Sequence, residues 1–167
     1  MAVLLAVPVL IVTLMTQMAI LSRLPLLHGT ADLVLLVLLA WALQEKVESA
    51  WEWTLIGGIL VSFVSAMPLF TPLLIYLGIT LIARLLYSRI WQVPILAMFV
   101  VTIVGTIFQH IISIFVLQIF NQTPVSWWVS LNQVTLPSAL LNLLLSLPVY
   151  VVITDLAKVV HPVEDEI

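Results

Sequence analysis

The sequence predicts an all-α, polytopic membrane protein: a single transmembrane domain over residues 1–167, with six helices crossing the bilayer in a compact bundle. Hydrophobic residues make up 63% of the chain and charged residues only 8%, and the mean hydropathy is +1.29. A soluble domain carries about 25% charged residues, because it needs a wet surface. Since a crossing takes about 20 apolar residues, six crossings leave no segment to fold outside the lipid.

Charge and cysteine content exclude several functions. The net charge is −3 and the chain has no basic block, so nucleic acid is not an expected partner. The chain has no cysteine, which excludes disulfides and thiolate metal sites.

Three spans are expected in the first half. The first covers about residues 2–21 and has no leading cation, so we interpret it as a retained helix rather than a cleavable signal peptide. The second, about 31–43, is short for a bilayer ~30 Å thick. The third covers about 51–66, with Ser49 as its expected N-cap and Glu52 in its first turn.

Three further spans are expected in the second half. A pair of prolines ends the third span and opens the fourth, about 72–87. The fifth, about 93–120, is the longest, and the sixth covers about 136–158. Between these two, residues 126–133 are too polar to span. Their paired tryptophans predict a segment that lies in the headgroup zone.

The positive residues predict the orientation. With six spans and the N-terminus inside, the cytoplasmic side holds Lys46, Arg84, Arg89 and Lys158, and the outer side holds only Arg23. Because cytoplasmic loops are enriched in lysine and arginine, both termini are predicted to be cytoplasmic.

Polar side chains within the spans should face protein, because lipid tails leave them unpaired. Bulky polar residues occur in the first, fifth and sixth spans, and they predict a polar intramembrane cavity lined by Gln17, Gln109, His110 and Asn142. A histidine at this depth could line a cavity, relay protons or bind a ligand. A neutral histidine bonded to a neighbouring helix is the simpler interpretation.

Small residues recur at helical spacing in the third and sixth spans. They predict a face for helix packing or for a partner helix, made of Gly57, Gly58, Ser62, Ser138 and Ser146. Packing within the bundle is the simpler interpretation, and the two glycines are the candidate docking surface if a partner binds.

No set of residues predicts catalysis. The acids Asp32, Glu52 and Asp155 fall near expected helix ends, where snorkelling or water contact suffices, and no hydrolase, metalloprotease or nucleotide-binding motif occurs. We therefore expect a protein that is not an enzyme, with no catalytic residue, no metal and no cofactor. An intramembrane enzyme built on His110 and Asn142 is the weakest hypothesis.

Several short stretches resemble one known family. Leu136-Pro137-Ser138-Ala139-Leu140-Leu141-Asn142, then Leu147-Pro148-Val149-Tyr150 and His161-Pro162, resemble the C-terminal signature of the rod shape-determining MreD proteins. Ala31-Asp32-Leu33 resembles the opening of that family's second span, with Ala31 where proline is usual. The stretch from Trp53 to Ser62 resembles its glycine-rich third span, with Ser62 where aspartate is common. The motif residues carried over are Asp32, Pro137, Asn142, Pro148 and Tyr150.

The resemblance implies a function. It implies a non-enzymatic scaffold of the bacterial elongasome in the inner membrane, which supports rod shape and lateral peptidoglycan synthesis. The implied direct partner is MreC, a single-span protein with a periplasmic coiled coil. The MreB filament and the RodA–penicillin-binding-protein synthase are implied as indirect partners. The lipid bilayer surrounds the chain, and a homo-oligomer is compatible with the sequence.

A second function stays open beside the first. The MreD family is similar in fold to the S-components of energy-coupling-factor transporters, which bind vitamins. Ala2-x-x-x-Ala6 fits the small-residue spacing by which S-components dock on their transport partner. Such a protein would need several converging polar and aromatic groups to hold its ligand.

Overall fold

The regular secondary structure in the described part of the chain is helical. The computed structural model describes residues 2–20, 28–68, 70–90, 93–121 and 126–161, and no β-strand occurs among them. The elements are α1 (Ala2–Ala19), α2 (Leu33–Ala42), α3 (Ala50–Val64), α4 (Thr71–Ile90), α5 (Pro94–Asn121), α6 (Trp127–Ser130), the π-helical turn η2 (Leu131–Thr135) and α7 (Leu136–Val160). The predicted all-α class is confirmed. Leu21, expected in the first span, and Arg23 lie outside the described residues.

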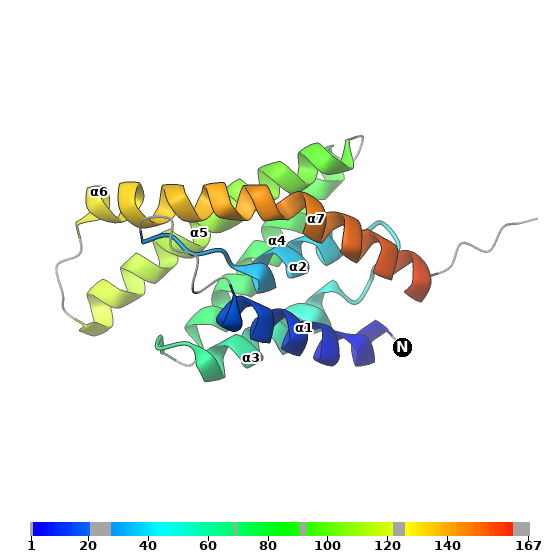
Figure 1. The fold of residues 1–167 in the computed structure, drawn as a ribbon, viewed down its shortest axis with the longest axis horizontal. Coiled ribbons are helices and arrows are strands. Elements are labelled where there is room, and N and C mark those ends of the chain that lie inside the picture. The colour runs from blue at the N-terminus through cyan, green and yellow to red at the C-terminus, as the bar shows by residue number, and fades with distance from the viewer. Residues whose placement is uncertain (1, 21–27, 69, 91–92, 122–125, 162–167) are drawn as a thin grey trace, which may run out of the picture.

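Successive long helices run in alternating directions, so Ala2 and His161 lie at the same end of the bundle (Figure 1). Three helical stretches are long and apolar enough to cross a membrane: Ala2–Ala19, Pro94–Phe120 and Trp127–Val160. The other three, Leu33–Ala42, Ala50–Val64 and Thr71–Tyr87, are apolar but shorter.

The short helix α2 is the centre of the bundle. Every residue from Val34 to Leu43 is buried, and α1, α3, α4, α5 and α7 all pack against this helix. A helix that is apolar on all sides is stable only when it is covered on all sides. At its C-terminal end Trp41 stacks on Trp53 of α3, with ring centroids 4.1 Å apart. The expected N-cap Ser49 makes no cap hydrogen bond; its hydroxyl accepts one from the Trp41 indole at 3.3 Å.

The long helices expose apolar residues and bury polar ones, the reverse of a helix on a water-soluble protein. In α5, Thr102 and Thr106 are fully buried. The exposed stripe of the same helix consists of Ile103, Ile107, Ile111, Phe115 and Ile119. Turning polar groups inward is what a hydrocarbon environment demands. The outer surface of the bundle is therefore suited to lipid.

Residues 126–133, predicted to lie in the headgroup zone, are continuous with the helix that follows them. The segments α6, η2 and α7 join into one helical stretch along the top of the bundle (Figure 1). The chain passes Pro137 without breaking because the preceding turn is wide: the Leu136 amide donates to the carbonyl of Leu131, five residues back. Pro137 has no N–H to give the carbonyl of Gln133. That carbonyl accepts instead from the amide of His28, at 3.1 Å.

Candidate functional site: a polar cavity around Asp32

The backbone before α2 runs extended along α7 and is held there by alternate amides. The amide of His28 donates to the Gln133 carbonyl at 3.1 Å, that of Thr30 to the Ser138 hydroxyl at 3.0 Å, and that of Asp32 to the Asn142 side-chain oxygen at 2.8 Å. Two extended residues advance ~6.7 Å and four helical residues ~6 Å. Acceptors about one helical turn apart therefore match every second residue of the extended segment.

Gly29 lets the two backbones approach closely. A Cβ atom at this position would lie 2.6 Å from both the Pro137 Cβ and the Ser138 backbone nitrogen, so only glycine fits. Helix α2 is ~15 Å long, and the extended residues 28–32 add ~16 Å. Together they match the ~30 Å of a bilayer core. The extended part is held against α7 by its amides, so its backbone donors are satisfied within the protein.

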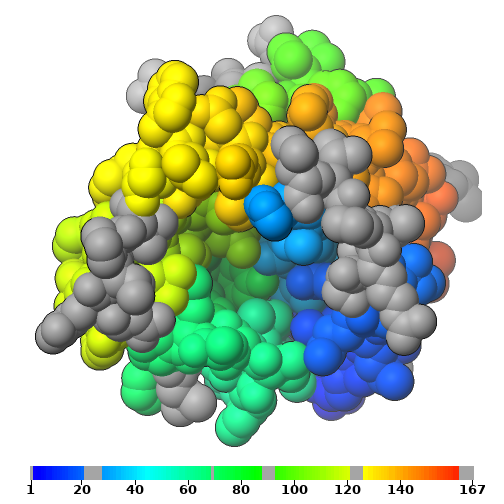
Figure 2. Space-filling view, turned by 60° about the vertical axis from the view of Figure 1, so that its left-hand side comes forward, coloured from blue at the N-terminus to red at the C-terminus, as the bar shows by residue number. Residues whose placement is uncertain are grey.

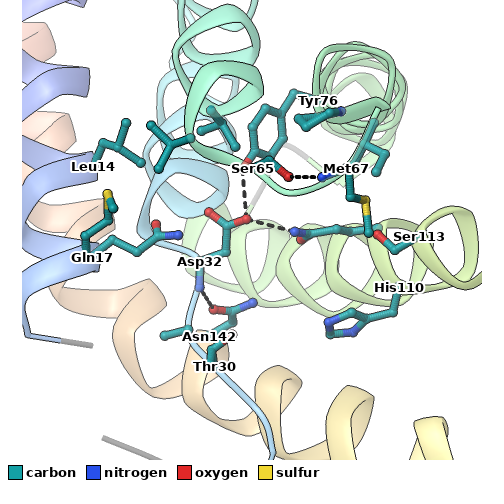
Figure 3. Close-up of a pocket in the computed structure, with 17 residues that line it drawn as sticks. Leu14, Gln17, Thr30, Asp32, Ser65, Met67, Tyr76, His110, Ser113 and Asn142 are labelled. Carbon is teal, nitrogen blue, oxygen red and sulfur yellow. Dashed lines mark hydrogen bonds between the residues drawn. The ribbon is translucent and has the colours of Figure 1, made fainter. Parts of the chain in front are cut away.

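Asp32 joins three helices through its carboxyl group. One oxygen, Oδ1, accepts from the amide of Leu35 at 2.9 Å and caps α2. The other, Oδ2, accepts from the Tyr76 hydroxyl of α4 at 2.8 Å and from the Gln109 amide of α5 at 2.9 Å (Figure 3). Asp32 is only 8% exposed. It does lie at a helix end, as the sequence predicts, but that end is inside the bundle, so snorkelling does not explain it.

Asn142 and Gln17 connect the remaining helices to the same point. The Asn142 oxygen accepts from the Asp32 amide, and its nitrogen donates to the Thr106 hydroxyl of α5 at 2.9 Å. Gln17 of α1 accepts from the amide of Val34, in the first turn of α2, at 3.2 Å. Five helices thus meet through polar groups around the N-terminus of α2.

A cavity of about 290 Å³ opens beside this network. All four residues predicted to share a polar cavity, Gln17, Gln109, His110 and Asn142, line it (Figure 3). The sequence prediction left out Asp32 and Tyr76, which also line it. A tyrosine within an apolar helix was a usable signal, because its hydroxyl needs a hydrogen-bond partner once it is buried.

A second cavity of about 330 Å³ adjoins the first, and the two share Met67, Gln109, His110 and Ser113 in their linings. The Nδ1 atom of His110, which lines both cavities, is buried and has no hydrogen-bond partner among the described residues. Figure 2 shows the molecule hollowed at this end, between α6, the last turns of α5 and α1, and the α3–α4 turn. The cavities open at the end of the bundle opposite to Ala2 and His161.

The two adjacent glycines of α3 pack against helices of the same chain. A Cβ atom on Gly57 would lie 3.2 Å from a methyl group of Leu38 in α2, and one on Gly58 would lie 2.9 Å from the Leu73 Cα in α4. Ser62, one turn later, is buried and donates to the Gly58 carbonyl at 2.7 Å. This face is covered by α2 and α4, so a partner helix would have to dock elsewhere.

The predicted residues of α7 lie in several different surroundings. Ser138 and Asn142 hold the extended segment, and buried Ser146 donates to the Leu143 carbonyl of its own helix at 2.7 Å. Pro148 lines an apolar groove of about 660 Å³ between α1, α2 and α7. Tyr150 is half-buried and packs against the core.

The polar groups that line the cavity are hydrogen-bond donors and acceptors. Within the described ranges, no group of three or more histidine, cysteine, aspartate or glutamate side chains could hold a metal ion. Comparisons of the chain with known protein families, with curated proteins and with solved structures find no match.

Proposed function

We propose that this chain is a six-span scaffold of the bacterial elongasome, similar to MreD, which binds the transmembrane helix of MreC. One observation carries the proposal: two stretches of the resemblance, around Asp32 and around Pro137–Asn142, come from opposite halves of the chain and are joined in space. The Asp32 amide donates to Asn142, and Gly29 packs directly against Pro137 and Ser138. Motif residues that are distant in sequence but joined in space are expected when the motif maintains a fold.

Six crossings are supported by the alternating helices and by the extended residues 28–32, which complete the second crossing. The orientation is supported by the cations. Arg84 donates to the Val47 carbonyl, and Lys46 and Lys158 line one shallow pocket that also contains His161. These cations lie at the end of the bundle that holds Ala2, so the positive-inside rule favours cytoplasmic termini and a cavity that opens to the periplasm.

The docking surface for MreC in this proposal is the apolar groove. Its walls are α1 and α7, and Leu33 and Val37 of α2 form its floor. Pro148 of the family motif lies in its lining, beside the exposed side chain of Val152. Such a groove offers a transmembrane helix close packing along its length, which drives association in lipid. MreB and the RodA–penicillin-binding-protein synthase would then be reached through MreC.

The cavity around Asp32 keeps a second function in view, that of a vitamin-binding S-component. Its volume is close to the lower end of the range found for small-molecule sites. Saturable nanomolar binding of a vitamin to the purified chain would favour this function over the scaffold.

Purification of the tagged chain from native membranes tests the scaffold. We expect it to recover a single-span protein with a periplasmic coiled coil. Val152→Trp, which fills the groove, should abolish recovery, and Leu81→Trp, on an exposed position of α4 outside the groove, should preserve it. Recovery without a single-span partner, or equal recovery with both variants, would contradict the proposal.

A further inference from the structure

The cavity around Asp32 has the form of a binding site as well as of a structural joint. It is about 290 Å³ in volume, opens at one end of the bundle and is lined by residues of six helical or extended segments. Structural joints in membrane bundles normally close around their polar groups, because small residues let the helices approach. Here a polar network is left beside open space.

The ionisable side chains of the cavity lining favour a positively charged ligand. Asp32 is the only acidic residue among the described residues that line the cavity, and no lysine or arginine is among them. The one ion pair found in the described part of the chain, between Lys158 and Asp155, lies on the exposed surface of α7. A buried carboxylate without a cation is costly, and a bound cation offsets that cost.

The N-terminus of α2 also favours a cationic ligand over an anionic one. Broken helices in transporters often present such a terminus to an anionic group of the substrate. Here the carboxyl group of Asp32 accepts from the Leu35 amide and occupies that position. An anion in the cavity would meet this carboxyl group, whereas a cation would be attracted to it.

The rest of the lining suits an amphipathic molecule. His110 contributes a buried Nδ1 atom that has no partner among the described residues. The side facing α1, α3 and α4 is apolar and is formed by Leu14, Val61, Val64 and Ile75. A ligand with a polar head toward Asp32 and an apolar body toward this wall would satisfy both halves.

We propose that the Asp32 cavity binds a small amphipathic molecule that carries a primary ammonium group. An ammonium group is a donor only, and the Asp32 carboxyl group, which accepts three of about four possible hydrogen bonds, can accept from it. The lining of this site shares no residue with that of the apolar groove, so the proposal does not rest on the binding of MreC.

Calorimetric titration of the full chain in phosphatidylcholine nanodiscs, with empty nanodiscs as baseline, tests the proposal. Three probes share a phenyl body: phenethylamine, the neutral 2-phenylethanol and the anionic 3-phenylpropanoate. We expect saturable binding of phenethylamine, with the alcohol at least tenfold weaker and the anion without binding. Absence of saturable phenethylamine binding, or equal binding of the amine and the alcohol, would overturn the proposal.

Two kinds of variant locate the binding. Asp32→Asn should weaken phenethylamine binding at least tenfold. Because it also alters the α2 cap, Val61→Phe provides an independent test: it fills the cavity and leaves Asp32 intact. Its matched control is Ile59→Phe, on the exposed side of the same helix. The site is refuted if Val61→Phe binds as tightly as Ile59→Phe.

Discussion

Asp32 and Asn142 each form hydrogen bonds with more than one other segment of the chain. Substitution of either residue should therefore affect the stability of the bundle. The Asp32 carboxyl group accepts three hydrogen bonds, and Asn142 uses both atoms of its amide. Removing either side chain leaves several buried donors or acceptors without partners. Each such group costs about 1–3 kcal/mol.

Asn142→Ala should therefore destabilise the chain strongly. It removes the acceptor of the Asp32 amide and the donor to Thr106, and we expect the free energy of unfolding to fall by roughly 2–4 kcal/mol. Unfolding in detergent, followed by circular dichroism, measures the change. Asn132→Ala is the control, because Asn132 is exposed and, among the described residues, its side chain bonds only to the Trp128 carbonyl one turn earlier. An equal loss in the two variants would show that the Asn142 network contributes nothing.

The residues of the cavity were only partly predictable. Gln17, Gln109, His110 and Asn142 stand out in the sequence because each is a bulky polar residue inside an apolar stretch. Asp32 did not, since a carboxylate at a helix end is normally explained by water contact. Only the fold shows that the end of α2 is covered by other helices.

Among the elements, the extended segment 28–32 is the least predictable from sequence. Its hydrogen-bond partners lie on α7, more than one hundred residues away along the chain. No local pattern encodes them, so a short hydrophobic run was all that the sequence offered. The burial of α2 is easier to predict, because the Trp41 indole is the only polar group among the side chains of its ten residues.

Gly29→Ala tests this segment. The added Cβ would lie 2.6 Å from the backbone nitrogen of Ser138, which cannot move aside without shifting α7. We expect a loss of about 1–3 kcal/mol and faster hydrogen exchange at the amides of Thr30 and Asp32. Gly105→Ala is the matched control, because the added atom would meet only side chains, at 3.3 Å or more. Unchanged exchange in Gly29→Ala would contradict the packing described here.

For the whole molecule, composition alone predicted the class, because a chain this apolar needs lipid around it. The arrangement within the bundle was not predictable: which helix is central, and which end is hollow, depend on contacts between distant segments. The distribution of buried threonines and exposed isoleucines in α5 agrees with a lipid environment.

The proposed topology is open to direct measurement, because the natural chain has no cysteine. We expect Lys46→Cys to react with a membrane-impermeant maleimide only after the inner membrane of spheroplasts is opened. Ser126→Cys, at the hollow end, should react in intact spheroplasts. Reaction of both from the same side would contradict six crossings with cytoplasmic termini.

The central claim is that the chain binds a single-span partner through the groove between α1 and α7. Its most direct test is photocrosslinking in living cells with benzoylphenylalanine placed at Val12 or Val152 in the groove, and at Leu81 of α4 as control. We expect a crosslink from both groove positions, but not from Leu81, to the transmembrane helix of MreC. Crosslinks to MreC from Leu81 alone, or from none of the three positions, would contradict it.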